Sequence, residues 1–287
     1  MKICRFNEDR VGVVIESTVT DVTDFVKSEL GSYCWPFPKG DVFIANLSAM
    51  IPGLTEYVET GNATSYELDA VTLISPVGNP GKIIAAPVNY ADHLDESNQD
   101  KGINFGTEIS LIDKYALFLK AGSSSVGPDE GISLPAVEGR RFDHEVELAL
   151  VIGKETRRVT VDEALSSVAG YFIGLDITMR GTEDRSYRKS FDSFTVMGPW
   201  LVTSDAFGSP EGVAFSLSVN GEQRQNANTN DLVWSVAKII SVASHAYTLY
   251  PGDVILTGTP AGVGPIKAGD KISASIDRIG SMEVPVK

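Results

Sequence analysis

Two glutamates and a distant aspartate are the residues of this sequence best placed to hold a metal ion. Glu145 and Glu147 lie in the apolar segment 144–153, HEVELALVIG, which is typical of a β-strand. Alternate residues of a strand point to the same face, so both carboxylates should project together. Asp176, in a second apolar segment at 170–177, would complete an all-oxygen site of the kind that Mg²⁺ or Mn²⁺ prefers. The alternative is an edge strand whose acids face solvent.

A histidine and a glutamate three positions apart form a second candidate group. His93 and Glu96, in NYADHLDE, would share one face of a helical turn, where the carboxylate can hold the imidazole in one tautomer. Such a pair can act as a general base, although the spacing is common by chance. The polar, turn-rich segment 97–113 that follows is expected to be a mobile loop or lid. We expect His144 to have a packing role and His245 to lie in the core.

The third group is a local concentration of positive charge. The stretch 180–189 carries three arginines and a lysine against two acids, in a chain with 24 basic and 38 acidic residues and a formal net charge of −14. Such a stretch could attract a small anionic substrate, although Arg185 and Arg188 are expected to lie on a solvated helix face. The glycine-rich segment 257–264, TGTPAGVG, has main-chain N–H groups that could receive a carboxylate.

These groups need a framework rich in β-strands. The apolar patterns predict strands at 82–86, 116–120, 144–153, 170–177 and 213–219, and helices at 21–30, 161–168 and 231–248. Asn220-Gly221 predicts a hairpin turn. The sequence lacks the βαβ alternation and the G-x-G-x-x-G or P-loop motifs of nucleotide-binding folds. The Pro/Gly cluster at 76–81 divides the chain into a small unit, residues 1–75, and a larger unit, residues 76–287.

The composition excludes several classes of protein. A pI near 4.6 argues against a nucleic-acid-binding protein, which would show a basic face. No apolar run approaches the roughly 18 residues that a membrane helix needs. The start, MKICRF, is not followed by the apolar segment of a signal peptide. Cys4 and Cys34 cannot form a disulfide framework, which fits a reducing compartment. We therefore expect a cytoplasmic protein that binds neither nucleic acid nor membrane.

Taken together, these segments resemble the fumarylacetoacetate hydrolase family. The matching motifs occur in the family's order over about residues 82–270: NYADHLDE, ALFLKAGSSSVGP, DHEVELALVIGK, AGYFIGLDIT, RKSFDSF, MGPWLV, VNGEQRQ, LYPGDVILTGTPAGVG and AGD. The resemblance implies a mainly β fold with some α (α+β), in which a β-roll catalytic domain follows a small N-terminal α+β domain. It also implies a homodimer with one divalent cation per subunit.

The resemblance assigns roles to individual residues. The metal ligands would be Glu145, Glu147 and Asp176. They would hold Mg²⁺, with Mn²⁺ or Ca²⁺ as alternatives. The catalytic residues would be His93, Glu96 and Lys189. The residues that bind the substrate would be Arg180, Glu183 and Thr259.

The implied activity is hydrolysis of a C–C bond in an acylpyruvate-type 2,4-dioxo acid, a small anionic 2-oxo acid, by way of a metal-bound enolate. In this scheme His93, oriented by Glu96, deprotonates water, and Lys189 stabilises the oxyanion. The same enolate would serve a β-keto acid decarboxylase, or an enol–keto isomerase or hydratase of aromatic meta-cleavage products. A catalytically inactive, metal-binding family member is a further alternative.

The sequence departs from the family in one motif. The family commonly has T-x-R-D-x-Q after the metal-ligand aspartate, and here Thr178 and Arg180 remain. Gly181 replaces the aspartate and Glu183 replaces the glutamine. If Glu183 lines the pocket, its carboxylate should repel a second carboxylate on the substrate. The departure therefore predicts a preference for acylpyruvates with a neutral distal group.

Overall fold

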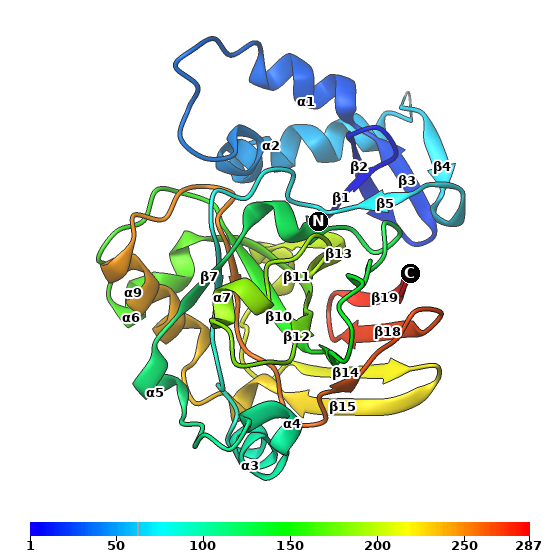
Figure 1. Cartoon of the computed structure of the whole chain (residues 1–287). Coiled ribbons are helices and arrows are strands. Elements are labelled where there is room, and N and C mark those ends of the chain that lie inside the picture. Colours follow the sequence, from blue (N-terminus) through cyan, green and yellow to red (C-terminus); the bar gives the residue numbers. More distant parts are fainter. Residues whose placement is uncertain (62) are drawn as a thin grey trace.

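The computed structural model describes residues 1–61 and 63–287, and a mixed sheet of twelve strands runs through it (Figure 1). Ten strands follow one another in the order β4-β3-β2-β1-β13-β11-β10-β16-β6-β7, while β5 pairs with β1 and β8 pairs with β13. The strands of this sheet are β1 (Lys2–Phe6), β2 (Arg10–Ile15), β3 (Thr18–Asp21), β4 (Ser65–Glu67), β5 (Leu73–Ile74), β6 (Ile83–Ala85), β7 (Phe118–Lys120), β8 (Ser125–Val126), β10 (Val146–Ile152), β11 (Val168–Asp176), β13 (Thr195–Thr203) and β16 (Val254–Leu256).

Two smaller sheets complete the β-structure. A three-stranded sheet has the order β12-β9-β17 and a four-stranded antiparallel sheet has the order β15-β14-β18-β19. Their strands are β9 (Phe142–His144), β12 (Thr178–Met179), β14 (Ala214–Val219), β15 (Glu222–Asn228), β17 (Gly264–Pro265), β18 (Lys271–Ile276) and β19 (Gly280–Pro285). The turn between β14 and β15 is Asn220-Gly221, where both residues have positive φ, 52° and 82°, as the hairpin motif predicts.

α-Helices and 3₁₀ turns connect the strands. The α-helices are α1 (Thr23–Leu30), α2 (Val42–Glu59), α3 (Ala91–Gln99), α4 (Lys101–Asn104), α5 (Ile112–Tyr115), α6 (Val161–Ala164), α7 (Arg185–Arg188), α8 (Ser204–Phe207) and α9 (Val236–Ala246). The 3₁₀ turns are η1 (Leu68–Ala70), η2 (Gly122–Ser124), η3 (Leu165–Ser167) and η4 (Thr229–Asp231). In Figure 1, α1 and α2 lie at the top of the molecule and α3 and α4 at the bottom. The segment 97–113, expected as a loop, thus contains the end of α3, all of α4 and the start of α5.

The N-terminal elements and the central strands belong to one continuous sheet. Strand β1 pairs antiparallel with β13, with Ile3 opposite Leu201. Helix α2 closes this region because its buried apolar side chains pack in one core with Ile3, Leu201 and Phe172 of β11. Strands from both sides of residues 76–81, where the composition predicts a domain boundary, therefore belong to the same sheet. The division into residues 1–75 and 76–287 stays a prediction.

Strand β10 lies in the interior of the large sheet, between β11 and β16. It pairs antiparallel with both neighbours, and all seven of its residues are buried. The alternative of an edge strand with outward-facing acids is therefore wrong. Because β10 and β11 adjoin, with Glu147 opposite Gly174, residues near the start of one strand lie beside those at the end of the other.

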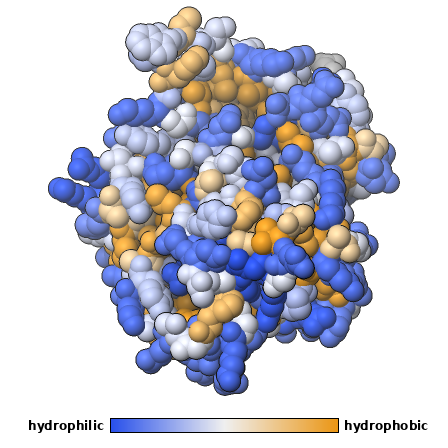
Figure 2. All heavy atoms as spheres, viewed as in Figure 1, coloured by the Kyte–Doolittle hydropathy of each residue, from blue (hydrophilic) through white to orange (hydrophobic). Residues whose placement is uncertain are grey.

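Hydrophilic residues predominate on the face of the molecule shown in Figure 2, with smaller apolar areas between them. Within residues 1–61 and 63–287, no helix combines the length and the apolar character needed to cross a bilayer.

Candidate active site

Three buried carboxylates converge where β10 and β11 adjoin. Glu145 lies in the single-residue gap between β9 and β10, Glu147 lies in β10, and Asp176 ends β11. One carboxylate oxygen from each can be chosen so that all three lie within 4.8 Å of one another. The main-chain N–H of Asp176 donates to the carbonyl of Glu145 at 2.9 Å, which fixes the two strands at this point. The structure thus brings together the three residues that the sequence analysis selects, and we call them the pocket floor.

Glu147 is the floor residue with the least compensation for its charge. Burial, Asp176 and Glu145 raise the pKa of its carboxyl group well above the usual range. Its Oε2 accepts a hydrogen bond from the main-chain N–H of Gly258, while Oε1 has no donor within the described part of the chain. A buried acid in this situation is stabilised in its ionised form by a nearby cation.

Glu145 is compensated by two basic side chains. Burial acts to raise its pKa, but Lys189 and Arg180 outweigh that effect and hold the pKa of Glu145 far below its usual range. Arg180 Nη2 donates to Glu145 Oε1 at 3.0 Å, and Arg180 Nε donates to Asp143 at 2.8 Å. Arg180 also lines the pocket, but its guanidinium group is already bound to Glu145 and Asp143.

Two lysines bind Asp176, and one of them also binds Glu145. Lys189 Nζ donates to Glu145 at 2.7 Å, to Asp176 at 2.7 Å and to Thr178 Oγ1 at 2.6 Å, so all three of its N–H bonds are used. Lys120, at the end of β7, is buried and pairs with the other oxygen of Asp176. Sequence reasoning missed Lys120. Its position at the end of a predicted strand, within the motif ALFLKAGSSSVGP, was the available signal.

The predicted histidine–glutamate pair forms in the first two turns of α3. His93 Nδ1 and Glu96 Oε2 are 3.0 Å apart, and the His93 side chain is buried against the pocket. With Nδ1–H donating to the carboxylate, the lone pair of Nε2 is free to accept a proton. The second carboxylate oxygen of Glu96 accepts the N–H of Gly262 at 2.9 Å. Glu96 therefore ties α3 to the glycine-rich segment 257–264.

Thr259 reaches the pocket from this glycine-rich segment, and its hydroxyl group is already engaged. It donates to the carbonyl of Val146 at 3.0 Å and accepts from Gln225 Nε2 at 2.8 Å. Gln225, on β15, also accepts the N–H of Val146 at 3.0 Å and bonds the His144 ring at 3.2 Å. Sequence reasoning missed Gln225, although it lies in the motif VNGEQRQ. It links the four-stranded sheet to the strand that carries Glu147.

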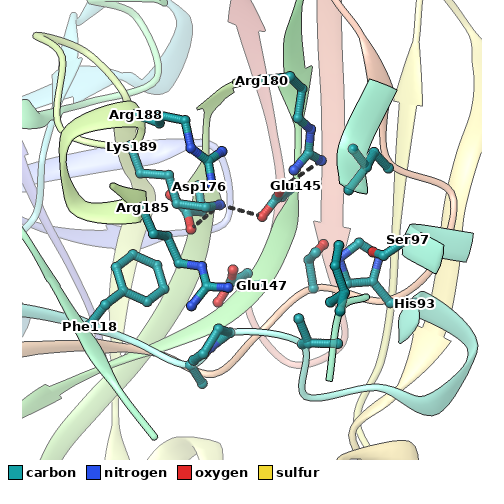
Figure 3. Close-up of a pocket in the computed structure, with 16 residues that line it drawn as sticks. His93, Ser97, Phe118, Glu145, Glu147, Asp176, Arg180, Arg185, Arg188 and Lys189 are labelled. Atoms are coloured by element: carbon teal, nitrogen blue, oxygen red, sulfur yellow. Dashed lines mark hydrogen bonds and ion pairs between the residues drawn. The ribbon is translucent and has the colours of Figure 1, made fainter. Parts of the chain in front are cut away.

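The pocket has two contrasting sides (Figure 3). His93 and Ser97 of α3 lie on one side of the floor, and Phe118, Arg185 and Arg188 lie on the other. Ile103 and Ile109, from the segment predicted as a lid, add apolar surface, so this segment covers the pocket. Whether it is mobile stays a prediction.

Three expectations about charged and histidine side chains need correction. Arg185 and Arg188 do not lie on a solvated helix face: both are half-buried and line the pocket, and we call them the basic wall. Glu183 is not among the pocket-lining residues. Its side chain is 39% exposed, and Arg140 binds both of its oxygens at 2.7 and 2.8 Å. His245, expected in the core, is exposed on α9.

The donor set of the floor fits a divalent metal ion. It offers only carboxylate oxygens, which Mg²⁺, Mn²⁺ and Ca²⁺ prefer as ligands. Glu147 supplies an oxygen with no donor and a charge that burial penalises, so a cation placed there would relieve the penalty. The residues present thus suit the metal that the resemblance implies.

The chain is similar to several proteins of known function. Residues 82–287 match the family model described as fumarylacetoacetate (FAA) hydrolase C-terminal. The chain is 51% identical over 289 residues to a maleylpyruvate hydrolase of Aquipseudomonas alcaligenes, covering 100% of this chain and 99% of that protein. It is 37% identical over 222 residues to a mitochondrial oxaloacetate tautomerase of Rattus norvegicus, covering 73% and 67%.

A solved structure extends the likeness to three dimensions. The crystal structure of maleylpyruvate hydrolase from Sphingobium sp. SYK-6, in complex with manganese(II) and pyruvate, superposes with a TM-score of 0.84. The two chains are 38% identical, and the match covers 100% of this chain and 98% of the other.

Proposed function

The chain belongs to the fumarylacetoacetate hydrolase family, and on that premise we propose that it is a divalent-metal-dependent hydrolase of acylpyruvate-type 2,4-dioxo acids. The observation that carries the proposal is the shared pocket. A buried floor of three carboxylates and a histidine oriented by a glutamate line the same cavity. A relative named maleylpyruvate hydrolase, and a related structure holding manganese and pyruvate, support the same class of substrate.

The metal would be held by the pocket floor, Glu145, Glu147 and Asp176. A bound dication would polarise the oxygens of the 2-oxo acid and stabilise the negative charge that develops as the C–C bond breaks. We expect Mg²⁺ as the native ion, with Mn²⁺, seen in the related structure, or Ca²⁺ as alternatives.

His93 acts as the general base. Its Nε2 takes a proton from water, while Glu96 keeps Nδ1 protonated and holds the ring against the pocket. The oxygen of that water adds to the acyl carbonyl carbon. The bond from this carbon to the neighbouring CH₂ then breaks, and the electron pair stays with the CH₂ carbon, which takes up a proton. The products are the carboxylate of the acyl group, pyruvate and one proton.

Lys189 and Thr259 position the reacting groups. All three N–H bonds of Lys189 are used, two by floor carboxylates and one by Thr178, so it can bind a substrate oxygen only by giving up one of these partners. A metal on those carboxylates would allow that exchange. The hydroxyl hydrogen of Thr259 is committed to Val146, which leaves its main-chain N–H to bind the substrate. Arg180 acts through Glu145, which it holds in place.

Enol–keto isomerisation is the second candidate, favoured by the relative named oxaloacetate tautomerase. It requires only proton transfer, which His93 could perform without activating water. A panel of acylpyruvates, oxaloacetate and 2-hydroxymuconate-type acids, assayed with Mg²⁺ or Mn²⁺, separates the two activities. A hydrolase gives pyruvate and a carboxylic acid by mass spectrometry. An isomerase changes the ultraviolet absorbance with no change of mass. Absence of cleavage across all the acylpyruvates would contradict the proposed hydrolysis.

A homodimer and a cytoplasmic location complete the proposal. Both follow from the family resemblance and the composition given above. Size-exclusion chromatography with light scattering tests the dimer directly, since a subunit has a mass of 30.8 kDa.

A further inference from the structure

Arg185 is a pocket cation that has no counter-ion in the described part of the chain. It lies on α7, its side chain is half-buried, and it lines the pocket beside Phe118 (Figure 3). Lys189 and Arg180 bind carboxylates of the floor or its neighbours. By contrast, within residues 1–61 and 63–287, Arg185 makes neither an ion pair nor a hydrogen bond. In an acidic chain, leaving such a group unpaired inside a pocket calls for an explanation.

The surroundings of Arg185 hold the guanidinium group without neutralising it. Its central carbon lies 4.9 Å from the ring centre of Tyr115 and 5.6 Å from that of Phe118, so two aromatic rings fix its direction. Burial lowers the pKa of Arg185, and the attraction of Glu145 and Asp176 only partly offsets it. A metal on these two acids would remove that attraction. The loaded site therefore leaves Arg185 in greater need of an anion.

Arg188 adds a second cation to the same wall. Its Nε donates to the carbonyl of Glu183 at 2.9 Å and its Nη1 to that of Met179 at 3.3 Å, so both partners are uncharged. Burial lowers the pKa of Arg188, and repulsion from the charges of Arg180 and Arg185 lowers it further. Two half-buried guanidinium groups facing one cavity favour a bound carboxylate, which can accept hydrogen bonds from both.

We propose that Arg185 and Arg188 are specificity-determining residues, which bind the second carboxylate of a dianionic acylpyruvate. This inference rests on the proposed function and assigns the residues that select its substrate; the maleyl group in the name of the related hydrolases carries such a second carboxylate. The carboxylate of the 2-oxo acid would have the metal and Lys189 as partners, which leaves the basic wall for a carboxylate at the far end of the acyl group. The preference is the reverse of the one that Glu183 predicts from sequence, because Glu183 lies outside the pocket and is held by Arg140.

The test compares two substrates of equal length. The dianion is 2,4-dioxoheptanedioate, which gives succinate and pyruvate, and the monoanion is 2,4-dioxoheptanoate, which gives butanoate and pyruvate. We expect wild-type protein to favour the dianion. Arg185→Gln should lower kcat/KM for the dianion roughly 10- to 100-fold, as expected for a lost charged hydrogen bond, with much less effect on the monoanion. Arg185→Lys, which keeps the charge, should recover part of the loss.

The control is Arg157→Gln, which removes the same charge from an exposed site outside the pocket and should leave the substrate preference unchanged. An equal loss for both substrates would overturn the proposal, since it would place Arg185 at the shared 2-oxo acid or in the fold alone. An unchanged ratio would overturn it as well. Unfolding midpoints of each variant identify a damaged fold.

Calorimetry separates this inference from the proposed function. If wild-type protein cleaves neither compound, binding of both compounds with and without Mn²⁺ still tests the basic wall. Tighter binding of the dianion by wild-type protein, lost in Arg185→Gln, supports the wall as a carboxylate site. Equal binding of the two compounds by wild-type protein would refute it.

Discussion

The pocket floor and the basic wall face one cavity but are built differently. The floor stands on β10 and β11, inside the large sheet, and two of its three carboxylates are paired with buried lysines or Arg180. The wall stands on α7, a single helical turn, and is half-exposed; within the described chain its two arginines have no acidic partner. The floor, on the sheet, holds the groups that metal-dependent chemistry needs. The wall, on a short helix between strands, holds the groups that we propose select the substrate.

The largest effect should come from removing a floor carboxylate. Glu147→Ala should abolish tight binding of Mg²⁺ or Mn²⁺ and lower activity by about a thousandfold or more, because two ligands cannot replace three on a hard dication. Calorimetry with each metal measures the affinity. Glu155→Ala, an exposed acid, is the matched control. Unchanged metal affinity in Glu147→Ala would show that the floor is not the metal site.

Without a metal, Glu147 should lower the stability of the fold, so replacing it with glutamine should raise that stability. The raised pKa of Glu147 means that ionising this group destabilises the fold. The fold therefore loses stability relative to Glu147→Gln as pH rises above about 4.3, the ordinary glutamate pKa, towards the raised value. Unfolding midpoints at pH 5 and pH 8 in a chelator test the sign. A variant less stable than wild type at pH 8 would contradict it.

Loss of the base should separate chemistry from metal binding. His93→Ala removes the Nε2 lone pair but leaves the floor intact, so hydrolysis should fall roughly 10²- to 10⁴-fold with the metal affinity unchanged. Steady-state rates and calorimetry on the same preparation measure both. His245→Ala, at an exposed position of α9, should change neither. Hydrolysis at a normal rate in His93→Ala would remove this residue from the mechanism.

A smaller effect should come from Gln225, which supports the floor from another sheet. Gln225→Leu leaves the N–H of Val146 without its acceptor and the hydroxyl of Thr259 without the hydrogen bond that it accepts, and should cost about 2–4 kcal/mol of folding free energy. Urea unfolding measures the loss. Gln223→Leu, two positions earlier on β15 and exposed, is the matched control. Equal stability of the two variants would mean that the buried network is dispensable.

The smallest effect should come from Glu183. Its hydrogen bonds from Arg140 lower the pKa of Glu183 to about 2, so the pair stabilises the fold above about pH 4.3 and this contribution fades as pH falls towards 2. Glu183→Gln should therefore lower the thermal unfolding midpoint slightly at pH 7. At pH 3 the difference between this variant and wild type should be smaller. The preference between the dianionic and monoanionic substrates should not change. A shift of that preference would return Glu183 to the pocket.

The floor could be predicted from sequence because regular structure fixes direction. Alternation within an apolar strand places Glu145 and Glu147 on one side, and an adjoining apolar strand supplies Asp176. The three-residue spacing of His93 and Glu96 likewise needs only one helical turn, and the two side chains meet at 3.0 Å.

The wall could not be predicted because no periodicity governs the residues between β12 and β13. There, Arg140 from a distant segment captures Glu183, and aromatic rings of other elements orient Arg185. Gln225 reaches the floor only through the packing of two sheets. Helix α2 was also missed. Pro52 and Gly53 interrupt its pattern, yet Asp41 caps its first turn and Leu47 and Leu54 pack beneath it.

The pairing of β1 with β13 has a consequence for producing shorter forms of the chain. The family match begins at residue 82, but the large sheet also includes earlier strands, since Lys2 and Ile3 of β1 pair with Val202 and Leu201 of β13. A chain cut at that point would leave this part of β13 with unpaired main-chain groups and would bare the apolar core beneath α2. Open strand edges next to apolar surface recruit further strands, so the shortened chain should aggregate even though every residue of the pocket floor is present.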